Sequence, residues 1–266
     1  MKELLIRTLT GISLVILVVA AILAGPLPFL VLGMVILSLG IRELFTLYPL
    51  RKTTLPRWLI AFSPVSLLPL LFLMLQLHWS PLFLLIPLGG WIFGLVWDRS
   101  LYPGLLTLFW LAVPFCSFYL LGYVGEDGAY RPLLPLTIII LIWINDTLAY
   151  LVGSHLGRHP LTPRLSPGKT WEGAAGGVLG ALLAGFVIHR VTGSFSSGVW
   201  ILISLITCLM GLSGDLFESY LKRKKQVKDT GGLLPGHGGI LDRFDSLLFV
   251  APVVLVLFHL FNNWLW

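Results

Sequence analysis

The run PLLPLTIIILIWINDTLAYLVG at residues 132–153 is almost entirely apolar and has one charged side chain, Asp146. A helix of about 20 apolar residues is long enough to cross the hydrocarbon core of a bilayer. The sequence therefore predicts a membrane-spanning helix here. Asp146 lies in its last part, WINDTLAY, just before a polar loop.

Further apolar runs give the whole chain the character of an integral membrane protein. Hydrophobic residues make up 57% of the 266 residues and charged residues only 11%, whereas a soluble domain of this length carries about 25% charged residues. We therefore expect an all-α polytopic membrane protein with about nine spans, although region 57–97 can be divided into one to three segments. The other runs are 8–24, 27–47, 57–77, 81–97, 103–123, 173–190, 198–214 and 246–265.

Positive charge gathers on one side of the predicted membrane. With about nine spans and a cytoplasmic N-terminus, all of the 18 Lys and Arg residues except Arg131 and Arg190 fall inside, as the positive-inside rule requires. The net charge of +6 is then explained by orientation and by contact with anionic lipid, so no nucleic-acid partner is expected. Trp264 and Trp266 would form an aromatic belt at the outer interface. We interpret the N-terminal run as a retained span rather than a signal peptide, because further spans follow at once.

The run 198–214 continues as GLSGDLFESYLKRKKQVKD. Its Asp215, Glu218, Ser219 and Lys222 are spaced by three or four residues and share one face of a helix. The small residues in GLSG allow helices to approach closely. We expect Asp215 at the very end of this span, where a carboxylate is costly unless it is paired or lines a wet cavity. It is a candidate functional residue, and the alternative is a solvated helix end.

A glycine-rich turn follows, from Lys228 and Asp229 through GGLLPGHGG. Glycines allow backbone N–H groups to approach a bound anion closely, and His237 between them would be exposed to that ligand. The alternative is an ordinary turn whose histidine makes an ordinary polar contact. The next segment, LDRFDS, contains Asp242 and Asp245 at the start of the last run, where carboxylates also serve as helix caps.

Acidic and basic groups from several helix ends thus share the predicted cytoplasmic face. Carboxylates hold hard divalent cations, and Mg²⁺ typically takes one or two of them, with water and phosphate completing its shell. Lysine and arginine side chains nearby would neutralise a polyphosphate. This combination is typical of metal-dependent phosphoryl or nucleotidyl transfer. The candidate metal ligands from this reasoning are Asp215 and Asp242, together with Asp146.

The loop after the run 132–153 contains a second polar motif, SPGKTWEG, at residues 166–173. Its Gly-Lys-Thr resembles the end of a Walker A motif, but Pro163 stands where the earlier glycine should be. No strand is expected in this loop. Lys169 can still contact phosphate as a point charge, and Glu172 at the start of the next run is a candidate helix cap.

Fixed positions in this part of the chain resemble the signature of one enzyme family. They read Ser219-x-x-Lys222-Arg223-x4-Lys228-Asp229-x-Gly231, then Pro235-x-His237-Gly238-Gly239-x-x-Asp242-Arg243-x-Asp245. The pattern is similar to that of the phosphatidate cytidylyltransferases, also called CDP-diacylglycerol synthases. The resemblance extends to SPGKTWEG and WINDTLAY, and the chain length and number of spans are similar to those of bacterial members. Some members have a second basic residue at Gly168, so no phosphate contact is expected there.

The resemblance implies an enzyme that joins CTP to phosphatidic acid, giving CDP-diacylglycerol and pyrophosphate. It also implies Mg²⁺ as cofactor, with a second metal ion left open, a homodimer, and a multi-pass location in a bacterial inner membrane. The chain then divides into N-terminal spans at 1–130 and a catalytic region at 131–266, which carries the signature at 215–246. The lipid phosphate is already an anionic nucleophile, so we expect direct in-line attack on the α-phosphorus of CTP. Charge neutralisation and positioning are then the main tasks.

By position, the resemblance also implies roles for individual residues. Asp215 and Asp242 are the first candidates for metal ligands, and Asp146 and Asp245 are further candidates. The other candidates would act on the phosphates or shape the nucleotide pocket. They are Ser166, Lys169, Ser219, Lys222, Arg223, Lys228, Asp229, His237, Gly238, Gly239 and Arg243.

Two other functions stay open from the sequence alone. A CTP-dependent polyprenol or other lipid kinase would use similar groups but would release CDP rather than pyrophosphate. A membrane transporter or channel is the non-enzyme alternative. The charges favour an enzyme, because they gather at one membrane face rather than at the midplane, where transporter sites usually lie.

Overall fold

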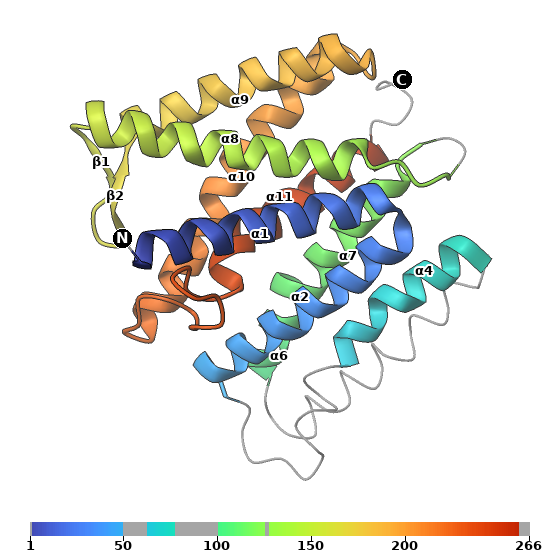
Figure 1. The fold of residues 1–266 in the computed structure, drawn as a ribbon, viewed down its shortest axis with the longest axis horizontal. Coiled ribbons are helices and arrows are strands. Elements are labelled where there is room, and N and C mark those ends of the chain that lie inside the picture. The colour runs from blue at the N-terminus through green and yellow to red at the C-terminus, as the bar shows by residue number, and fades with distance from the viewer. Residues whose placement is uncertain (1, 50–62, 78–100, 126–127, 261–266) are drawn as a thin grey trace. The chain divides into compact units, whose positions relative to one another are not determined.

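A computed structural model describes residues 2–49, 63–77, 101–125 and 128–260 of the chain (Figure 1). These residues are mostly helical, and their only two strands form one short hairpin. Several of the helices are long and apolar. The fold is that of an all-α polytopic membrane protein, as the sequence predicts.

In the described part of the chain, 7 helices are long and apolar enough to cross a membrane, and each corresponds to a predicted run. Region 57–77 is described only from Ser63, as a 3₁₀ turn η1 (Ser63–Ser66) and the short helix α4 (Leu67–Leu77). The predicted run 81–97 lies outside the described residues. The total of about nine spans and the cytoplasmic N-terminus therefore stay predictions. The 7 spans are Ile6–Ala24, Pro26–Leu47, Pro103–Tyr123, Leu133–Leu156, Trp171–Thr192, Ser197–Lys224 and Leu241–Leu260.

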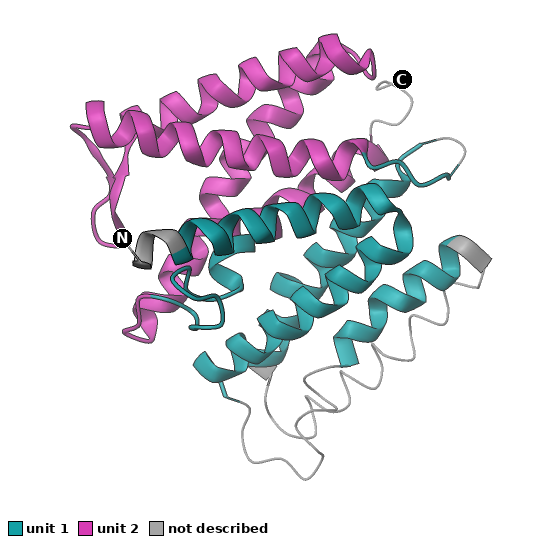
Figure 2. Cartoon of the chain, viewed as in Figure 1, with its two compact units in different colours: residues 1–132, 229–244 teal, residues 133–228, 245–266 magenta. Residues whose placement is uncertain are grey.

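The chain forms two compact units, which are described separately (Figure 2). Unit 1 comprises residues 1–132 and 229–244, and unit 2 comprises residues 133–228 and 245–266. The glycine-rich segment of the signature therefore belongs to unit 1, with the N-terminal helices. The Asp215–Lys222 segment belongs to unit 2.

Unit 1 begins with two long helices, α1 (Lys2–Ala24) and α2 (Pro26–Leu47). Gly25 between them has φ +119°, which glycine adopts without strain. Pro26 opens α2 in the first turn, where its missing N–H is harmless. A second, irregular helical run includes one π-helical turn. It consists of α6 (Leu101–Leu105), the π turn η3 (Leu106–Ala112), α7 (Val113–Leu120) and the 3₁₀ turn η4 (Leu121–Tyr123).

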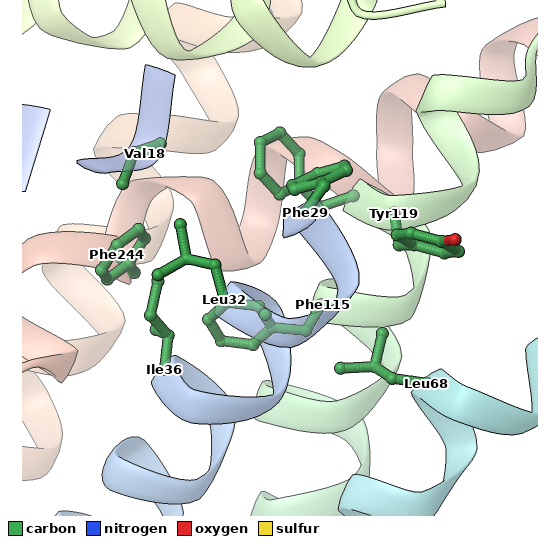
Figure 3. A pocket seen from close by; sticks show the side chains of 10 residues that line it. Val18, Phe29, Leu32, Ile36, Leu68, Phe115, Tyr119 and Phe244 are labelled. Atoms are coloured by element: carbon green, nitrogen blue, oxygen red, sulfur yellow. The ribbon is translucent and has the colours of Figure 1, made fainter. Parts of the chain in front are cut away.

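Aromatic side chains fill the core of unit 1. Phe29 of α2 meets Phe118 of α7 edge to face, with ring centroids 5.1 Å apart, a favourable geometry for aromatic pairs. Tyr130 donates a hydrogen bond of 2.8 Å from its hydroxyl to the Ile22 carbonyl. A cavity of about 20 Å³ remains beside these rings, with Leu68 of α4 on its wall (Figure 3). Its lining is almost wholly apolar, so we interpret it as a dry packing defect.

Unit 2 consists of helices and one hairpin. Its helices are α8 (Leu133–Leu156), α9 (Trp171–Thr192), α10 (Ser197–Lys224) and all but the first turn of α11 (Leu241–Leu260). Glycines of α9 face α8. A Cβ added to Gly176 would lie 2.5 Å from Val152 Cγ2, and one on Gly177 would lie 2.6 Å from Asn145 Oδ1. Small residues thus allow the close packing of α8 and α9, as in other membrane helix pairs.

The hairpin corrects one prediction. The loop before α9 pairs β1 (Pro160–Thr162) with β2 (Ser166–Thr170) in antiparallel fashion, where no strand was expected. Proline is tolerated because both strands of an isolated hairpin are edge strands. The rejection of a Walker A motif is unaffected, because it depends on Pro163.

Glu172 is not the helix cap that the sequence suggests. Thr170 caps α9, because its hydroxyl accepts a hydrogen bond of 3.1 Å from the Gly173 N–H. The Glu172 carboxylate instead accepts hydrogen bonds from the backbone N–H groups of Arg158 at 3.2 Å and His159 at 3.3 Å. It also contacts the His159 ring at 2.5 Å. Glu172 therefore fixes the segment that enters the hairpin.

Candidate active site

The helix α10 continues past the predicted end of its span, from residue 214 to Lys224. Two i,i+4 contacts stabilise the extension. Ser219 Oγ donates a hydrogen bond of 3.3 Å to Asp215 Oδ1, and Lys222 Nζ lies 3.0 Å from Glu218 Oε2. Asp215 is therefore inside a continuous helix rather than at its end, and the predicted shared face of these four residues is confirmed.

Lys169 of β2 forms an ion pair with Asp215. Their side chains are 26% and 32% exposed, so a ligand could reach both. Partly exposed pairs contribute about 0–1 kcal/mol to stability, so stability alone does not explain this one. Asp146 of α8 lies within electrostatic range of both residues and accepts a hydrogen bond of 3.1 Å from the Asn145 side chain. Three predicted site residues thus meet in unit 2.

A more buried pair lies one turn further along α10. The side chains of Glu218 and Lys222 are 1% and 14% exposed. Asp245 of α11 interacts electrostatically with Glu218 and Asp215. The helix α11 approaches α10 closely at Gly214, which has no side chain. An added Cβ there would lie only 3.1 Å from the Asp245 carbonyl carbon. The close helix approach predicted from GLSG is confirmed.

Other predicted basic residues of unit 2 lie near the hairpin or at the end of α10. Arg223 donates from Nε to the Leu165 carbonyl and from Nη1 to the Val227 carbonyl, each at 3.4 Å. It therefore ties the hairpin turn to α10. Ser166 is half-buried in β2, and Lys228 is exposed. We name Asp146, Lys169, Asp215, Glu218, Ser219, Lys222 and Asp245 the polar cluster of unit 2.

The signature loop, residues 229–240, is closed by Asp242 in unit 1. Asp242 Oδ2 accepts hydrogen bonds from the Thr230 N–H at 3.0 Å, the Thr230 hydroxyl at 3.0 Å and the Gly239 N–H at 2.8 Å. The carboxylate thus joins both ends of the loop. A metal-binding role for Asp242 stays a prediction beside this structural one.

Glu43 of α2 is a second carboxylate that holds the signature loop. It is 4% exposed. It accepts hydrogen bonds from the N–H groups of Ile240 at 2.8 Å and Leu241 at 3.0 Å. Its Oε2 also lies 3.1 Å from the Thr230 hydroxyl, whose single proton is shared between Glu43 and Asp242. The sequence analysis missed Glu43. A lone carboxylate in the apolar run 27–47 is the signal that could have found it.

Two glycines of the loop have left-handed backbone conformations. Gly236 has φ +73° and Gly238 has φ +79°. A hydrogen bond of 3.0 Å from the Leu234 N–H to the Gly238 carbonyl closes the turn from residue 234 to residue 238. Other side chains rarely adopt such angles. The glycines were predicted to bring backbone N–H groups to a bound anion. The N–H of Gly239 meets Asp242, an anion of the protein itself, and contact with nucleotide stays a prediction.

His237 lies at the tip of the loop and against α1. A Cβ on Gly11 would lie 3.2 Å from His237 Nε2. Burial lowers the pKa of His237, and the charges of Arg243 and Arg7 lower it further. Because the ordinary pKa of histidine is already below 7, this lowered pKa leaves the ring mainly neutral at pH 7.

The predicted site residues therefore fall into two groups. The polar cluster of unit 2 contains Asp215, and the signature loop with Asp242 belongs to unit 1, together with Asp229, Gly238 and Arg243. Within the described ranges, no three His, Cys, Asp or Glu side chains form a group suited to hold a metal ion.

The family model and the similar proteins that match this chain are all cytidylyltransferases. The match to the cytidylyltransferase family covers residues 5–261. A phosphatidate cytidylyltransferase of Staphylococcus aureus (strain COL) is 32% identical over 95% of this chain and 98% of its own length. One of Bacillus subtilis (strain 168) is 34% identical over 96% of this chain and 98% of its own length. One of Staphylococcus haemolyticus (strain JCSC1435) is 39% identical over 58% of this chain and 57% of its own.

The chain is thus an enzyme of the nucleotidyltransferase class with apolar, membrane-length helices. It belongs to the cytidylyltransferase family. The resemblance inferred from the signature residues is confirmed.

Proposed function

We propose that the protein transfers a cytidylyl group from CTP to phosphatidic acid, giving CDP-diacylglycerol and pyrophosphate. The observation that carries this proposal is the similarity, along nearly the whole chain, to proteins named phosphatidate cytidylyltransferase. The polar cluster of unit 2 adds chemical support, because it combines carboxylates with lysines that lie within reach of a ligand.

In the proposed reaction, an oxygen of the lipid phosphate attacks the α-phosphorus of CTP. The bond from the α-phosphorus to the oxygen that bridges to the β-phosphorus breaks, and pyrophosphate leaves with the electron pair. Both reactants are anions, so the protein must neutralise charge and align the two groups. Lys169 and Lys222 are the cations of the polar cluster, and we assign them to the phosphates of CTP.

The residues fit a requirement for Mg²⁺. This ion needs only one or two carboxylates, since water and substrate phosphates complete its octahedral shell. The negative charge of the Asp215 carboxylate is already balanced by a cation, the ammonium group of Lys169. We propose that Asp215 is a metal ligand in unit 2, with Asp146 and Asp245 as further ligands there, and that Asp242 is a metal ligand in unit 1. When bound, the ion would neutralise the triphosphate and the pyrophosphate that leaves.

The proposed site suits substrates from two phases. Phosphatidic acid presents its phosphate at headgroup level, whereas CTP is dissolved in the cytoplasm. We infer a multi-pass position in a bacterial inner membrane, with the polar cluster and the signature loop on the cytoplasmic side. Positive charge at this face would also attract both anions.

Pyrophosphate release tests this function directly. Purified protein in detergent is given CTP, phosphatidic acid and Mg²⁺, each omitted in turn. We expect release only with all three, and a loss of at least 100-fold in Asp215→Asn and Asp242→Asn, because each removes a charge that the reaction needs. Arg190→Gln is the control, since Arg190 is exposed near the end of α9, and it should keep full activity.

The products separate this function from its alternatives. Release of CDP instead of pyrophosphate would identify a lipid kinase. Pyrophosphate release with a lipid other than phosphatidic acid would keep the reaction type and reject the substrate. A folded protein without turnover on any such pair would reject the enzymatic proposal.

A further inference from the structure

The first half of α1 packs against the tip of the signature loop, and both belong to unit 1 (Figure 2). Thr10 Oγ1 lies 3.2 Å from the Pro235 carbonyl oxygen, and its single proton is shared between this acceptor and the Ile6 carbonyl at 2.9 Å. The Arg7 side chain lies against Gly236, where an added Cβ would meet Arg7 Cγ at 2.7 Å. The first helix and the signature loop therefore form one continuous surface.

This surface contains an open groove of about 470 Å³, which is within the usual size of small-molecule sites. The groove has a polar end and an apolar end. The polar end is lined by Arg7, Gly11 and His237, and the apolar end by Ile12, Val15 and Ile16. The helix rises about 13 Å from Arg7 to Ile16, so the groove could cover a headgroup and the first part of an acyl chain.

The apolar end favours a lipid over a nucleotide. Ile12, Val15 and Ile16 are 51%, 38% and 61% exposed. They belong to the candidate span Ile6–Ala24, so acyl chains of a bilayer could reach them directly. CTP carries no apolar group that would cover these side chains, whereas an acyl chain is as apolar as they are and can lie against them within the bilayer.

The polar end favours a phosphate group. The guanidinium group of Arg7 is a cation with planar donors that match phosphate oxygens. His237 beside it is also influenced by the charge of Arg243. A phosphomonoester, with up to two negative charges, complements the Arg7 guanidinium of this groove better than a zwitterionic headgroup does.

We propose that this groove binds the lipid substrate, with the phosphate of phosphatidic acid at Arg7 and His237 and one acyl chain along Ile12, Val15 and Ile16. The inference rests on the function proposed above. It adds a lipid site formed by the first helix, which lies outside the signature. The occupant is an anionic diacyl phospholipid with a phosphomonoester head, not free phosphate or nucleotide.

Photo-crosslinking tests the site without catalysis. The wild-type protein in nanodiscs of phosphatidylcholine is given phosphatidic acid with a diazirine in one acyl chain, without CTP. We expect crosslinks at residues 12–16 of α1, mapped by mass spectrometry. Unlabelled phosphatidic acid should compete for them, and phosphatidylcholine with the same chains should not. Equal competition by both lipids, or crosslinks confined to other helices, would overturn the proposal.

Steady-state kinetics gives a second test. Ile16→Trp fills the apolar end, and we expect it to raise the KM for phosphatidic acid at least tenfold while the KM for CTP stays within twofold. Leu17→Trp is the matched control, because Leu17 is 53% exposed on the same helix but does not line the groove. It should behave as the wild type. A change of both KM values in Ile16→Trp would indicate general damage and count against the groove.

The two tests separate this proposal from the proposed function. If the wild type makes CDP-diacylglycerol but Ile16→Trp keeps the wild-type KM for the lipid, the groove proposal fails and the function stands. If crosslinking is selective for phosphatidic acid but no turnover occurs, the groove stands and the function fails.

Discussion

At the scale of single residues, Glu43 is the buried carboxylate that holds the signature segment, because it accepts two backbone hydrogen bonds and shares the Thr230 hydroxyl with Asp242. Glu43→Gln keeps the side-chain size but turns an amide nitrogen toward those donors. Hydrogen bonds to charged groups contribute about 1.5–3 kcal/mol. We therefore expect the free energy of unfolding to fall by roughly that amount, and residues 229–240 to become sensitive to protease. Thermal unfolding in detergent and limited proteolysis measure both effects.

Glu172→Gln is the control for this substitution. Glu172 also accepts backbone hydrogen bonds, but its side chain is 27% exposed and holds the hairpin of unit 2. It should leave cleavage in residues 229–240 unchanged. A signature loop that stays as protected in Glu43→Gln as in the wild type would show that Glu43 does not hold it.

Individual charged residues could be predicted from the sequence, but their partners could not. Asp215 and Lys169 stand out because charge is rare in this chain, at 11% of residues. Their ion pair depends on a hairpin that the sequence analysis did not expect. The contact of Thr230 with Glu43 joins residues 187 positions apart. No local pattern indicates such a pair.

At the scale of helices, the packing of α10 against α11 depends on Gly214. A methyl group there would lie 3.1 Å from the Asp245 carbonyl carbon and 3.2 Å from Phe249 Cδ2. Overpacking of this kind usually costs about 1–3 kcal/mol, and here it would move Asp245 away from the polar cluster. We expect Gly214→Ala to lower the melting temperature and to reduce cytidylyltransfer at least tenfold.

Gly33→Ala is the matched comparison within a helix of unit 1. Its Cβ would lie 3.6 Å from Leu68 Cδ1, an ordinary contact, beside the small apolar cavity. Alanine favours a helix over glycine by up to about 1 kcal/mol, so this variant should be as stable as the wild type or more stable. If Gly214→Ala also melts like the wild type, close packing at Gly214 is not required.

Helix positions were predictable and helix ends were not. The apolar runs locate the long helices, because a span needs about 20 apolar residues. The run at 198–214 ends where charge begins, yet α10 continues to Lys224. The pairs Asp215 with Ser219 and Glu218 with Lys222 satisfy polar groups within the helix. Basic residues in the last turn also complement the helix dipole.

At the scale of the whole molecule, the sequence predicts the class of the fold but not the grouping of its helices. Every span is apolar, so hydrophobic pattern does not distinguish one neighbour from another. The signature segment follows α10 in the chain, but its loop belongs to unit 1, where the Ile240 N–H donates a hydrogen bond to Glu43 of α2. Only three-dimensional packing reveals that the signature is divided between two units.

Orientation in the membrane decides whether CTP can reach the proposed site. About nine spans and a cytoplasmic N-terminus place the segment after α10 inside the cell and Trp266 outside, with basic residues in the last turn of α10 on the inner face. We expect green fluorescent protein fused after Lys225 to fluoresce and alkaline phosphatase at the same place to be inactive. After Trp266 the two reporters should give the reverse result.

If both fusions report the cytoplasm, α11 does not cross the membrane and an odd number of spans is wrong. If the fusion after Lys225 reports the outside, the polar cluster faces away from cytoplasmic CTP, and the proposed reaction cannot occur there whatever the purified protein does in detergent.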